Sequence, residues 1–307
     1  MTAMVTIMSV TVSMFCSHVE PIVGARCERL VELATLMEQA GADQIVFSEH
    51  VVLGPDLEMH GGAPFPFPVD HNYPEPLIAL AAIAGATRRL RLSTGILIAP
   101  MRPAVLLAKM AATLDVVSGG RFDLGLGAGW HAAELRSAGN DPAHAMQTLE
   151  DTLGACRALW GGGPASFHSQ SVSFDGLYCY PRPASGAALP VWLAGPCARS
   201  TFRRIARLGN GWVPFGNVTA DAIARGSAML DDAAAAEGRD RASFGIRASL
   251  PIGTGSPRER LDYALAAAPE FIAAGATALQ LPLFRLADDF DTAFELTSIA
   301  VRAIHSL

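Results

Sequence analysis

Short apolar segments alternate with longer segments of helical periodicity along most of the chain. Eight segments are short and apolar enough to form buried strands: residues 5–12, 44–47, 90–98, 121–126, 190–193, 211–214, 244–250 and 278–281. Apolar positions recur at helical spacing in residues 22–40, 76–87, 104–117, 132–160, 199–208, 220–237, 258–274 and 290–305. Eight strand–helix units with right-handed crossovers predict an α/β fold, a closed TIM (β/α)8 barrel that takes up all of residues 1–307 as one domain.

Two segments depart from this alternation. Residues 54–74, after the second strand, are rich in Gly, Pro and His and predict a long irregular insert. Residues 161–190 contain alternating polar and aromatic positions and predict a hairpin before the fifth strand. Active sites of such barrels lie at the carboxyl ends of the strands, so the residues that follow each strand are the first candidates for function.

Glycines dominate the end of the fourth strand. Side chains alternate along it, so Gly125, Gly127 and Gly129 share one face while Leu124 and Leu126 share the other. Glycine weakens a strand unless a ligand or another backbone must come close. We therefore expect this face, which lacks side chains, to receive something flat at the barrel mouth. The alternative is tight packing of neighbouring elements or a bulge.

Composition argues against several classes of function. Half of the residues are hydrophobic and 17% are charged, which indicates a large core and not a disordered chain. A net charge of −6 without any basic tract argues against a nucleic-acid partner. The five cysteines have neither CxxC nor zinc-site spacing, so we expect no metal. Apolar runs are shorter than the ~20 residues of a membrane helix, and the start lacks a signal-peptide pattern, so we expect a cytoplasmic protein that contacts no membrane.

Ionisable and small residues follow three of the strands. Glu49 and His50 come directly after the second strand, where a histidine beside a carboxylate can pass a proton or orient a ligand. A helix cap or an ion pair is the alternative. Gly95, after the third strand, permits an unusual backbone conformation or a bulge. The turn from Gly195 to Arg199 opens a helix whose unpaired N–H groups suit a phosphate, unless it is an ordinary capped turn.

Longer segments are similar to one known family. They are FSEHV at Phe47, PEPLIALAAIAGATRRLRLSTGILIAP at Pro74, RPAVLLAKMAATLDVVSGGRFDLGLGAGWHAAEL at Arg102 and LPVWLAGPCARSTFRRIARLGNGW at Leu189. In these segments the chain resembles the bacterial luciferase-like monooxygenase superfamily, in particular its branch of oxidoreductases that depend on the deazaflavin coenzyme F420. The resemblance implies a TIM barrel with an insertion before the fifth strand, a homodimer, and a cofactor ring across the C-terminal mouth.

The resemblance also implies roles for single residues. It places Glu49 and His50 near the ring, with His50 in proton transfer or substrate orientation and Glu49 in contact with the cofactor. It implies a non-prolyl cis peptide bond at Gly95-Ile96, behind the ring. The expected cofactor-binding residues are Glu49, Gly95, Ile96, Gly127, Gly129, Trp130, Gly195, Pro196, Cys197, Ala198 and Arg199.

The activity that the resemblance implies is hydride transfer between C5 of the deazaflavin and a small organic substrate, whose identity stays open. One alternative is an FMN-dependent two-component monooxygenase, and another is a barrel that binds a ligand without catalysis. Trp130 stands where sugar-phosphate dehydrogenases of this branch carry an acid, and Gly209-Asn210-Gly211 replaces the Gly-Asp-Gly that is usual among relatives near the sixth strand. The Arg-Gly found in many relatives after the fourth strand is also missing, so we expect different substrate and tail contacts.

Overall fold

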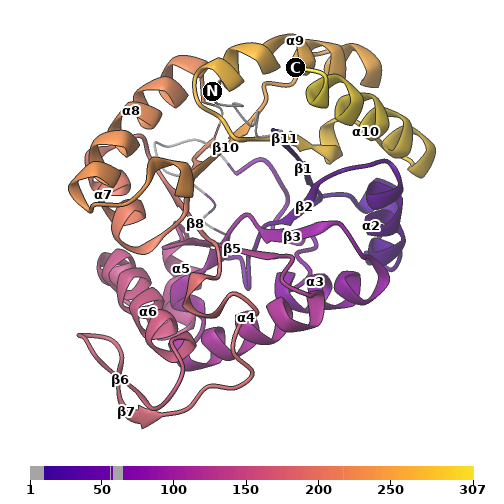
Figure 1. The fold of residues 1–307 in the computed structure, drawn as a ribbon. Helices are drawn as coiled ribbons and strands as arrows, with labels where there is room; N and C mark the ends of the chain where they lie inside the picture. Colours follow the sequence, from indigo (N-terminus) through magenta and orange to yellow (C-terminus); the bar gives the residue numbers. More distant parts are fainter. Residues whose placement is uncertain (1–9, 56, 58–64, 217) are drawn as a thin grey trace.

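Parallel strands close into a barrel in the computed structural model, which describes residues 10–55, 57, 65–216 and 218–307 (Figure 1). β1 pairs with both β2 and β11, and β3 pairs with β5, so the described strands form a ring. The expected eight-stranded α/β barrel is confirmed. Its strands are β1 (Thr11–Phe15), β2 (Gln44–Phe47), β3 (Arg91–Thr94) continued by β4 (Leu97–Ile98), β5 (Phe122–Gly127), β8 (Val191–Gly195), β9 (Gly211–Pro214), β10 (Gly245–Ser249) and β11 (Ala278–Pro282).

Helices surround the barrel as an outer layer (Figure 1). They are α1 (Glu20–Val23), α2 (Leu30–Gln39), α3 (Pro76–Ala86), α4 (Ala104–Ser118), α5 (Ala132–Ser137), α6 (Ala145–Trp160), α7 (Arg199–Leu208), α8 (Ala220–Ala236), α9 (Pro257–Ala273) and α10 (Phe290–His305). Two helical predictions each become two helices, because Gly24 (φ 94°) and Gly139 (φ 79°) take positive φ values that a helix does not continue through. Within the described part of the chain, no helix is both long and apolar enough to span a bilayer.

Two strand predictions also change. The first strand, predicted over residues 5–12, runs instead from Thr11 to Phe15, and residues 5–9 lie outside the described residues. The strand predicted over residues 90–98 is interrupted at Gly95-Ile96, which has the cis peptide bond that the resemblance implied.

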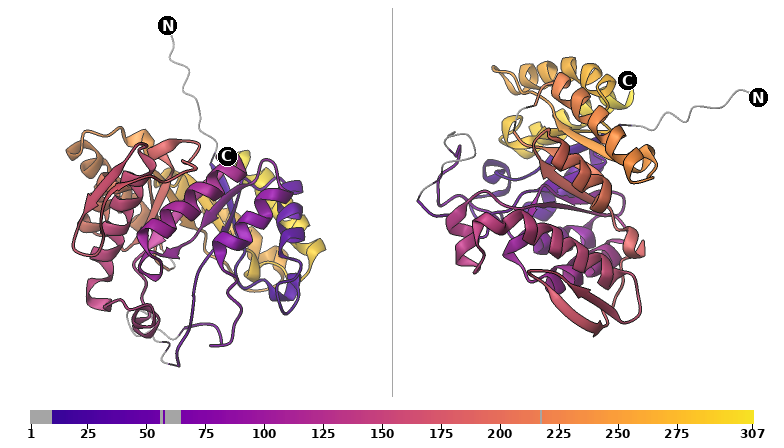
Figure 2. Two further views of the ribbon diagram at one scale, coloured as in Figure 1. Left: turned by 90° about the horizontal axis from the view of Figure 1, so that it is seen from below. Right: turned by 90° about the vertical axis from the view of Figure 1, so that its left-hand side faces the viewer.

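Both predicted irregular segments lie where the alternation breaks. β6 (Ala165–His168) and β7 (Ser173–Leu177) form the antiparallel hairpin expected before β8, and it projects beside α6 (Figure 1). The described part of the insert after β2 has no helix or strand. Figure 2 shows this insert leaving the barrel at the end opposite to the C terminus of the chain.

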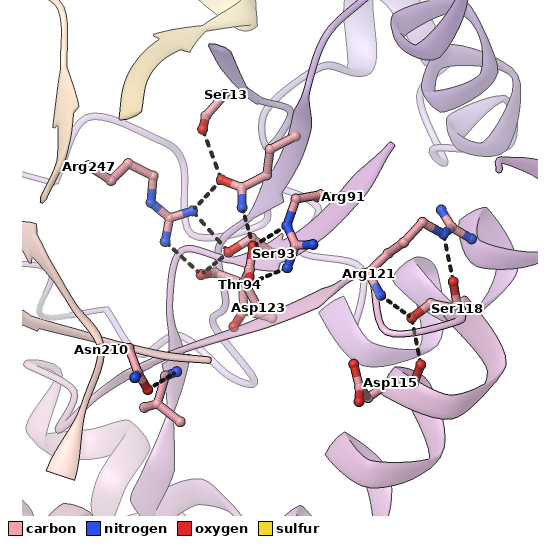
Figure 3. Close-up of polar contacts among 12 residues, drawn as sticks. Ser13, Arg91, Ser93, Thr94, Asp115, Ser118, Arg121, Asp123, Asn210 and Arg247 are labelled. Atoms are coloured by element: carbon pink, nitrogen blue, oxygen red, sulfur yellow. Dashed lines mark hydrogen bonds and ion pairs between the residues drawn. The ribbon is translucent and has the colours of Figure 1, made fainter. Parts of the chain in front are cut away.

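Polar side chains fill one level of the barrel interior, which we call the polar layer (Figure 3). Ser13 donates to Gln44 Oε1 (2.8 Å), and Gln44 donates to Asp123 Oδ2 (2.7 Å). Arg91 donates to both Asp123 oxygens at 3.0 and 2.6 Å. The members of the polar layer are Ser13, Gln44, Arg91, Ser93, Asp123 and Arg247.

Trp192 packs beside the polar layer and occupies the space of two missing side chains. A Cβ on Gly211 or Gly245 would overlap the Trp192 indole. The guanidinium of Arg247 lies 5.2 Å from the centre of the Trp192 ring. Small residues on β9 and β10 thus let one large side chain fill the interior, as close packing requires.

Candidate active site at the carboxyl ends of the strands

A cavity of ≈ 350 Å³ opens at the carboxyl ends of the strands, where barrel enzymes keep their active sites. Its volume is within the range of small-molecule sites. Most of its wall is apolar, and Gln280 donates to Ser249 Oγ (2.9 Å) within it. The lining residues are Phe15, Gly95, Ile96, Ala194, Val213, Pro214, Phe215, Gly216, Ser249, Leu250, Ile252, Gln280, Pro282, Phe284 and Arg285.

Gly125 and Gly127 of β5, and Gly129 two residues beyond its end, do not form an open face for a ligand, which corrects the expectation from sequence. A Cβ on Gly125 would overlap the Thr94 carbonyl oxygen, and one on Gly127 would lie 2.7 Å from Ile96 Cδ1. Gly129 has a φ of 82°, and its Cβ would lie 2.7 Å from an atom of Ile98. The chain from β3 to β4 bends into this space, so the packing alternative holds. The bend itself reaches the cavity wall.

Glu49 is buried in an ion pair and does not line the cavity. Arg102 donates to both of its carboxylate oxygens, and the N–H of Ile98 donates to Oε2 at 2.8 Å. Arg102 also pairs with Glu75. Burial raises the pKa of the Glu49 carboxyl, and Arg102 opposes that rise. The ion-pair alternative therefore describes Glu49, which holds β4 in place behind the cavity.

His50 lies among aromatic rings, outside the lining of the cavity. Its Nδ1 is 2.9 Å from Glu134 Oε2, and 9% of its side chain is exposed. The rings of Phe65, Tyr73 and Trp130 meet it edge to face, with centroids 5.6, 5.1 and 5.4 Å away. A carboxylate at Nδ1 fixes the N–H on that side, so Nε2 is the nitrogen left to exchange a proton. Trp130 contacts His50 and is absent from the cavity wall.

A second histidine, His18, connects this aromatic region with the cavity. Its Nδ1 lies 2.5 Å from His71 Nε2, which is itself 3.2 Å from Glu20 Oε1. Its ring is 5.1 Å from Tyr73 and 5.4 Å from Phe284, a residue of the cavity wall. Burial, followed by the charges of His71 and His50, lowers the pKa of His18 to about 3. Neutral His18 can therefore accept a hydrogen bond from His71.

The turn after β8 leads from the cavity wall into α7. Ala198 is the N-cap residue, and no side chain caps the helix. The N–H groups of Thr201 and Phe202 bond to the Ala198 carbonyl at 2.9 and 3.3 Å, which leaves those of the two preceding residues outside the helical pattern. A Cβ on Gly195 would lie 2.8 Å from Thr201 Cγ2, so the tight turn needs glycine there. An uncapped helix start of this kind attracts anions.

Of the expected cofactor residues, Gly95 and Ile96 line the cavity, and the turn from Gly195 to Arg199 adjoins it through Ala194. The other lining residues come mainly from the ends of β1, β9, β10 and β11. Most of these residues are apolar, as core residues also are, so no signal in the sequence distinguishes a residue of the cavity wall from a residue of the core. His18 was missed because it stands alone in the sequence, and His71 lies in the insert of residues 54–74, for which only an irregular conformation was predicted. Across the described ranges, no three His, Cys, Asp or Glu side chains converge as metal ligands.

A sequence model of one family, described as luciferase-like monooxygenase, matches residues 8–297. The chain belongs to this family. A Mycobacterium tuberculosis protein described as uncharacterized is 33% identical over 167 residues, which are 54% of this chain and 58% of that protein. The chain thus spans a little over half the length of this curated relative. Enzymes of the family act as oxidoreductases or monooxygenases.

Two solved structures share the fold of this family member. An F420-dependent secondary alcohol dehydrogenase in complex with an F420-acetone adduct has a TM-score of 0.77 at 15% identity, with 97% of this chain and 99% of that chain covered. The oxygenating constituent of 3,6-diketocamphane monooxygenase from Pseudomonas putida, in complex with FMN, has a TM-score of 0.73 at 16% identity, with 95% and 97% covered. At these identities the likeness concerns the fold alone.

Proposed function

We propose that this luciferase-like protein is an oxidoreductase that moves a hydride between C5 of coenzyme F420 and a small organic substrate. One observation carries the proposal: an apolar cavity over Gly95-Ile96 is lined by Ala194 of β8, and the turn that follows Ala194 leads to the uncapped start of α7. A planar ring in the cavity and an anionic tail at the helix start would use both features at once. The motifs shared with the F420-dependent branch, and the F420-dependent neighbour of similar fold, support this choice of cofactor.

The residues present fit such a ring. Gly95 and Ile96 would support one of its faces, with Val213 and Pro214 beside it, and the N–H groups at the start of α7 would bind a phosphate. The bound deazaflavin would supply hydride chemistry at C5, while the protein supplies position and electrostatics.

We assign proton transfer to His50. Glu134 holds its Nδ1, so Nε2 takes or gives the proton. Tyr73 lies 5.1 Å from the rings of both His50 and His18, and His18 contacts Phe284 in the cavity wall. The aromatic region therefore adjoins the space in which a substrate would bind. Glu49, which the sequence assigned to cofactor contact, contributes by holding β4.

The second candidate is an FMN-dependent monooxygenase. The FMN-bound neighbour, with a TM-score of 0.73, favours it. The cofactor decides between the two reactions. Position 5 of the ring is a carbon in a deazaflavin and a nitrogen in FMN, and the carbon disfavours the reaction with molecular oxygen that the flavin allows.

Titration of the purified protein with oxidised and reduced F420, and in parallel with FMN, tests the proposal through absorbance and fluorescence. We expect F420 to bind at least tenfold more tightly than FMN. Tighter binding of FMN would select the monooxygenase. Failure of both to bind would contradict both and favour a ligand-binding barrel without catalysis.

We also propose a homodimer that forms through α3 and α4. α3 is apolar on all sides, yet Ile78 is 69% exposed, and Val117 on the adjacent α4 is 59% exposed. A helix that is apolar on all sides is normally buried. Sedimentation of the wild type should show a dimer, and Ile78→Glu should shift it toward the monomer. A monomeric wild type at micromolar concentration would contradict the proposal.

A further inference from the structure

Arg247 is a buried cation in the polar layer, on β10. It is 2% exposed, and Figure 3 shows its guanidinium directed at the end of β3. It donates to Ser93 Oγ at 2.9 Å, and to the Thr94 carbonyl and Gln44 Oε1 at 3.3 Å each. Its Nε has no hydrogen-bond partner among the residues that the structure describes. Its hydrogen-bond partners among the described residues are all neutral oxygens.

The polar layer therefore carries an excess of positive charge. Its carboxylate, Asp123, forms its ion pair with Arg91, and Arg247 forms none with any residue in the described ranges. Two arginines thus face one acid. Burial lowers the pKa of Arg247 to about 10, although the charge of Asp123 opposes that change, and the guanidinium is still charged at neutral pH. A buried charge is normally paired with an opposite charge. Arg247 has no ionic partner among the described residues, so its charge remains available to attract an anionic ligand.

Arg247 lies directly below the cavity. Ser249, two residues further along β10, lines the cavity wall, and two strand residues span about 7 Å. The Thr94 carbonyl that accepts from Arg247 immediately precedes Gly95, another residue of the wall. Arg247 is 2% exposed, so solvent screens its charge only weakly.

We propose that Arg247 makes the cavity selective for planar ligands that carry negative charge on the edge facing the barrel axis. The inference rests on the proposed function in one respect, that the natural ligand is a conjugated heterocycle. Arg247 is a positioning residue in this scheme, since it touches neither the ring nor the substrate and acts through the field and through the Thr94 carbonyl.

The test uses two planar probes of one shape, 2-naphthoate and 2-naphthamide, of which the first is an anion. Their dissociation constants are measured for the wild type, Arg247→Met and Asp123→Asn. Arg247→Met should lower the preference for naphthoate about tenfold. Asp123→Asn should raise it, because that variant removes a negative charge from the same layer. A structural role alone would make both variants weaken both probes alike.

Arg285, which lines the cavity, also attracts anions, so the series is repeated with Arg285→Met. The effect of Arg247 should persist in that background. If Arg247→Met does not fold, Arg247→Lys takes its place. The lysine variant must keep the preference for naphthoate over naphthamide, and Asp123→Asn must raise that preference.

An unchanged preference in Arg247→Met, a shift of the same sign in both charge variants, or failure of both probes to bind overturns the inference. Failure of F420 and FMN to bind, with the naphthoate preference intact, would instead overturn the proposed function alone.

Discussion

The polar layer and the cavity above it share the strands β1 and β10, and they differ in how their side chains are satisfied. In the polar layer, Asp123 accepts hydrogen bonds from Gln44 and Arg91 at distances of 2.6 to 3.0 Å. In the cavity wall, apolar side chains surround an open space of ≈ 350 Å³, and Ser249 bonds to Gln280. Successive inward positions of one barrel thus serve two purposes. The lower level stabilises the fold, and the upper level is left free for a ligand.

The bend between β3 and β4 joins these two levels. It follows Ser93 and Thr94 of the lower level and provides Gly95-Ile96 to the upper one. Glu49 and the glycines of β5 contact the bend from behind. Substitutions at these supports should therefore cost stability and binding together, whereas substitutions in the cavity should affect binding alone.

The largest expected effect is at Glu49. Glu49→Ala leaves the buried Arg102 with one acid, Glu75, and leaves the Ile98 N–H without its acceptor. Breaking a buried pair in this way should cost about 3 kcal/mol of unfolding free energy. Urea unfolding measures the loss, and ligand titration should show weaker binding as the bend relaxes.

Glu150→Ala is the matched control. Its partners, Arg204 and Arg207, lie on partly exposed helix surface, so the change should cost at most about 1 kcal/mol. Equal losses at Glu49 and Glu150 would show that burial does not set the strength of the Glu49 pair.

Gly125→Ala should cause the second-largest loss of unfolding free energy. The added Cβ would overlap the Thr94 carbonyl, so β3 must shift, which should cost about 2–3 kcal/mol. Gly85→Ala on α3 is the control, because no described atom lies within 4 Å of the Cβ it adds. That change should stabilise the protein by up to about 1 kcal/mol. Wild-type stability of Gly125→Ala would refute the view that the glycines of β5 serve close packing against β3.

The third effect in size is a pH-dependent contribution of His18 to the free energy of unfolding. Its folded pKa of about 3 lies below the unfolded value of 6.5, so below pH 6.5 the unfolded chain binds the proton more readily. The contribution of His18 is therefore complete above pH 6.5 and falls by up to about 1.4 kcal/mol per pH unit as the solution is acidified toward pH 3.

His18→Asn provides the comparison, since asparagine tolerates the φ of 63° at this position. The difference in unfolding free energy between wild type and variant should shrink between pH 6.5 and 4.5. A difference that stays constant over this range would contradict the burial of a neutral His18.

The smallest effect on stability, with a large effect on binding, is expected at Val213. Its side chain lines the cavity, so Val213→Trp fills space that the proposed ring would occupy. We expect at least a tenfold loss of F420 affinity in the fluorescence titration, with less than about 1 kcal/mol change in stability. Unchanged affinity would place the ring elsewhere.

Much of the fold follows from local patterns. The bounds of β2, β9, α7 and α10 agree with the periodicity, because each is flanked by turn residues and carries an uninterrupted pattern. The breaks at Gly24 and Gly139 were not predicted, because a glycine inside an apolar period is compatible with either a helix or its end.

The site was predictable only in part. Gly95, Ile96 and the turn after Gly195 lie at or beside the cavity. Glu49 and the glycines of β5 were predicted in the correct region but with the wrong contacts. For Glu49 the reason is that an acid at a strand end gives the same sequence signal whether its side chain contacts a ligand or an arginine. Arg102, which pairs with Glu49, lies 53 residues away in the chain.

The sequence by itself determined the order of strands and helices, the closed barrel and the end of it at which the cavity opens, because these depend on short-range periodicity and on the geometry of parallel crossovers. Tertiary structure alone decided which side chains satisfy one another and which remain available. Arg247 and Gln44 are 203 residues apart, yet they meet in the polar layer. Contacts of that kind depend on the packing of the whole barrel and leave no pattern along the chain.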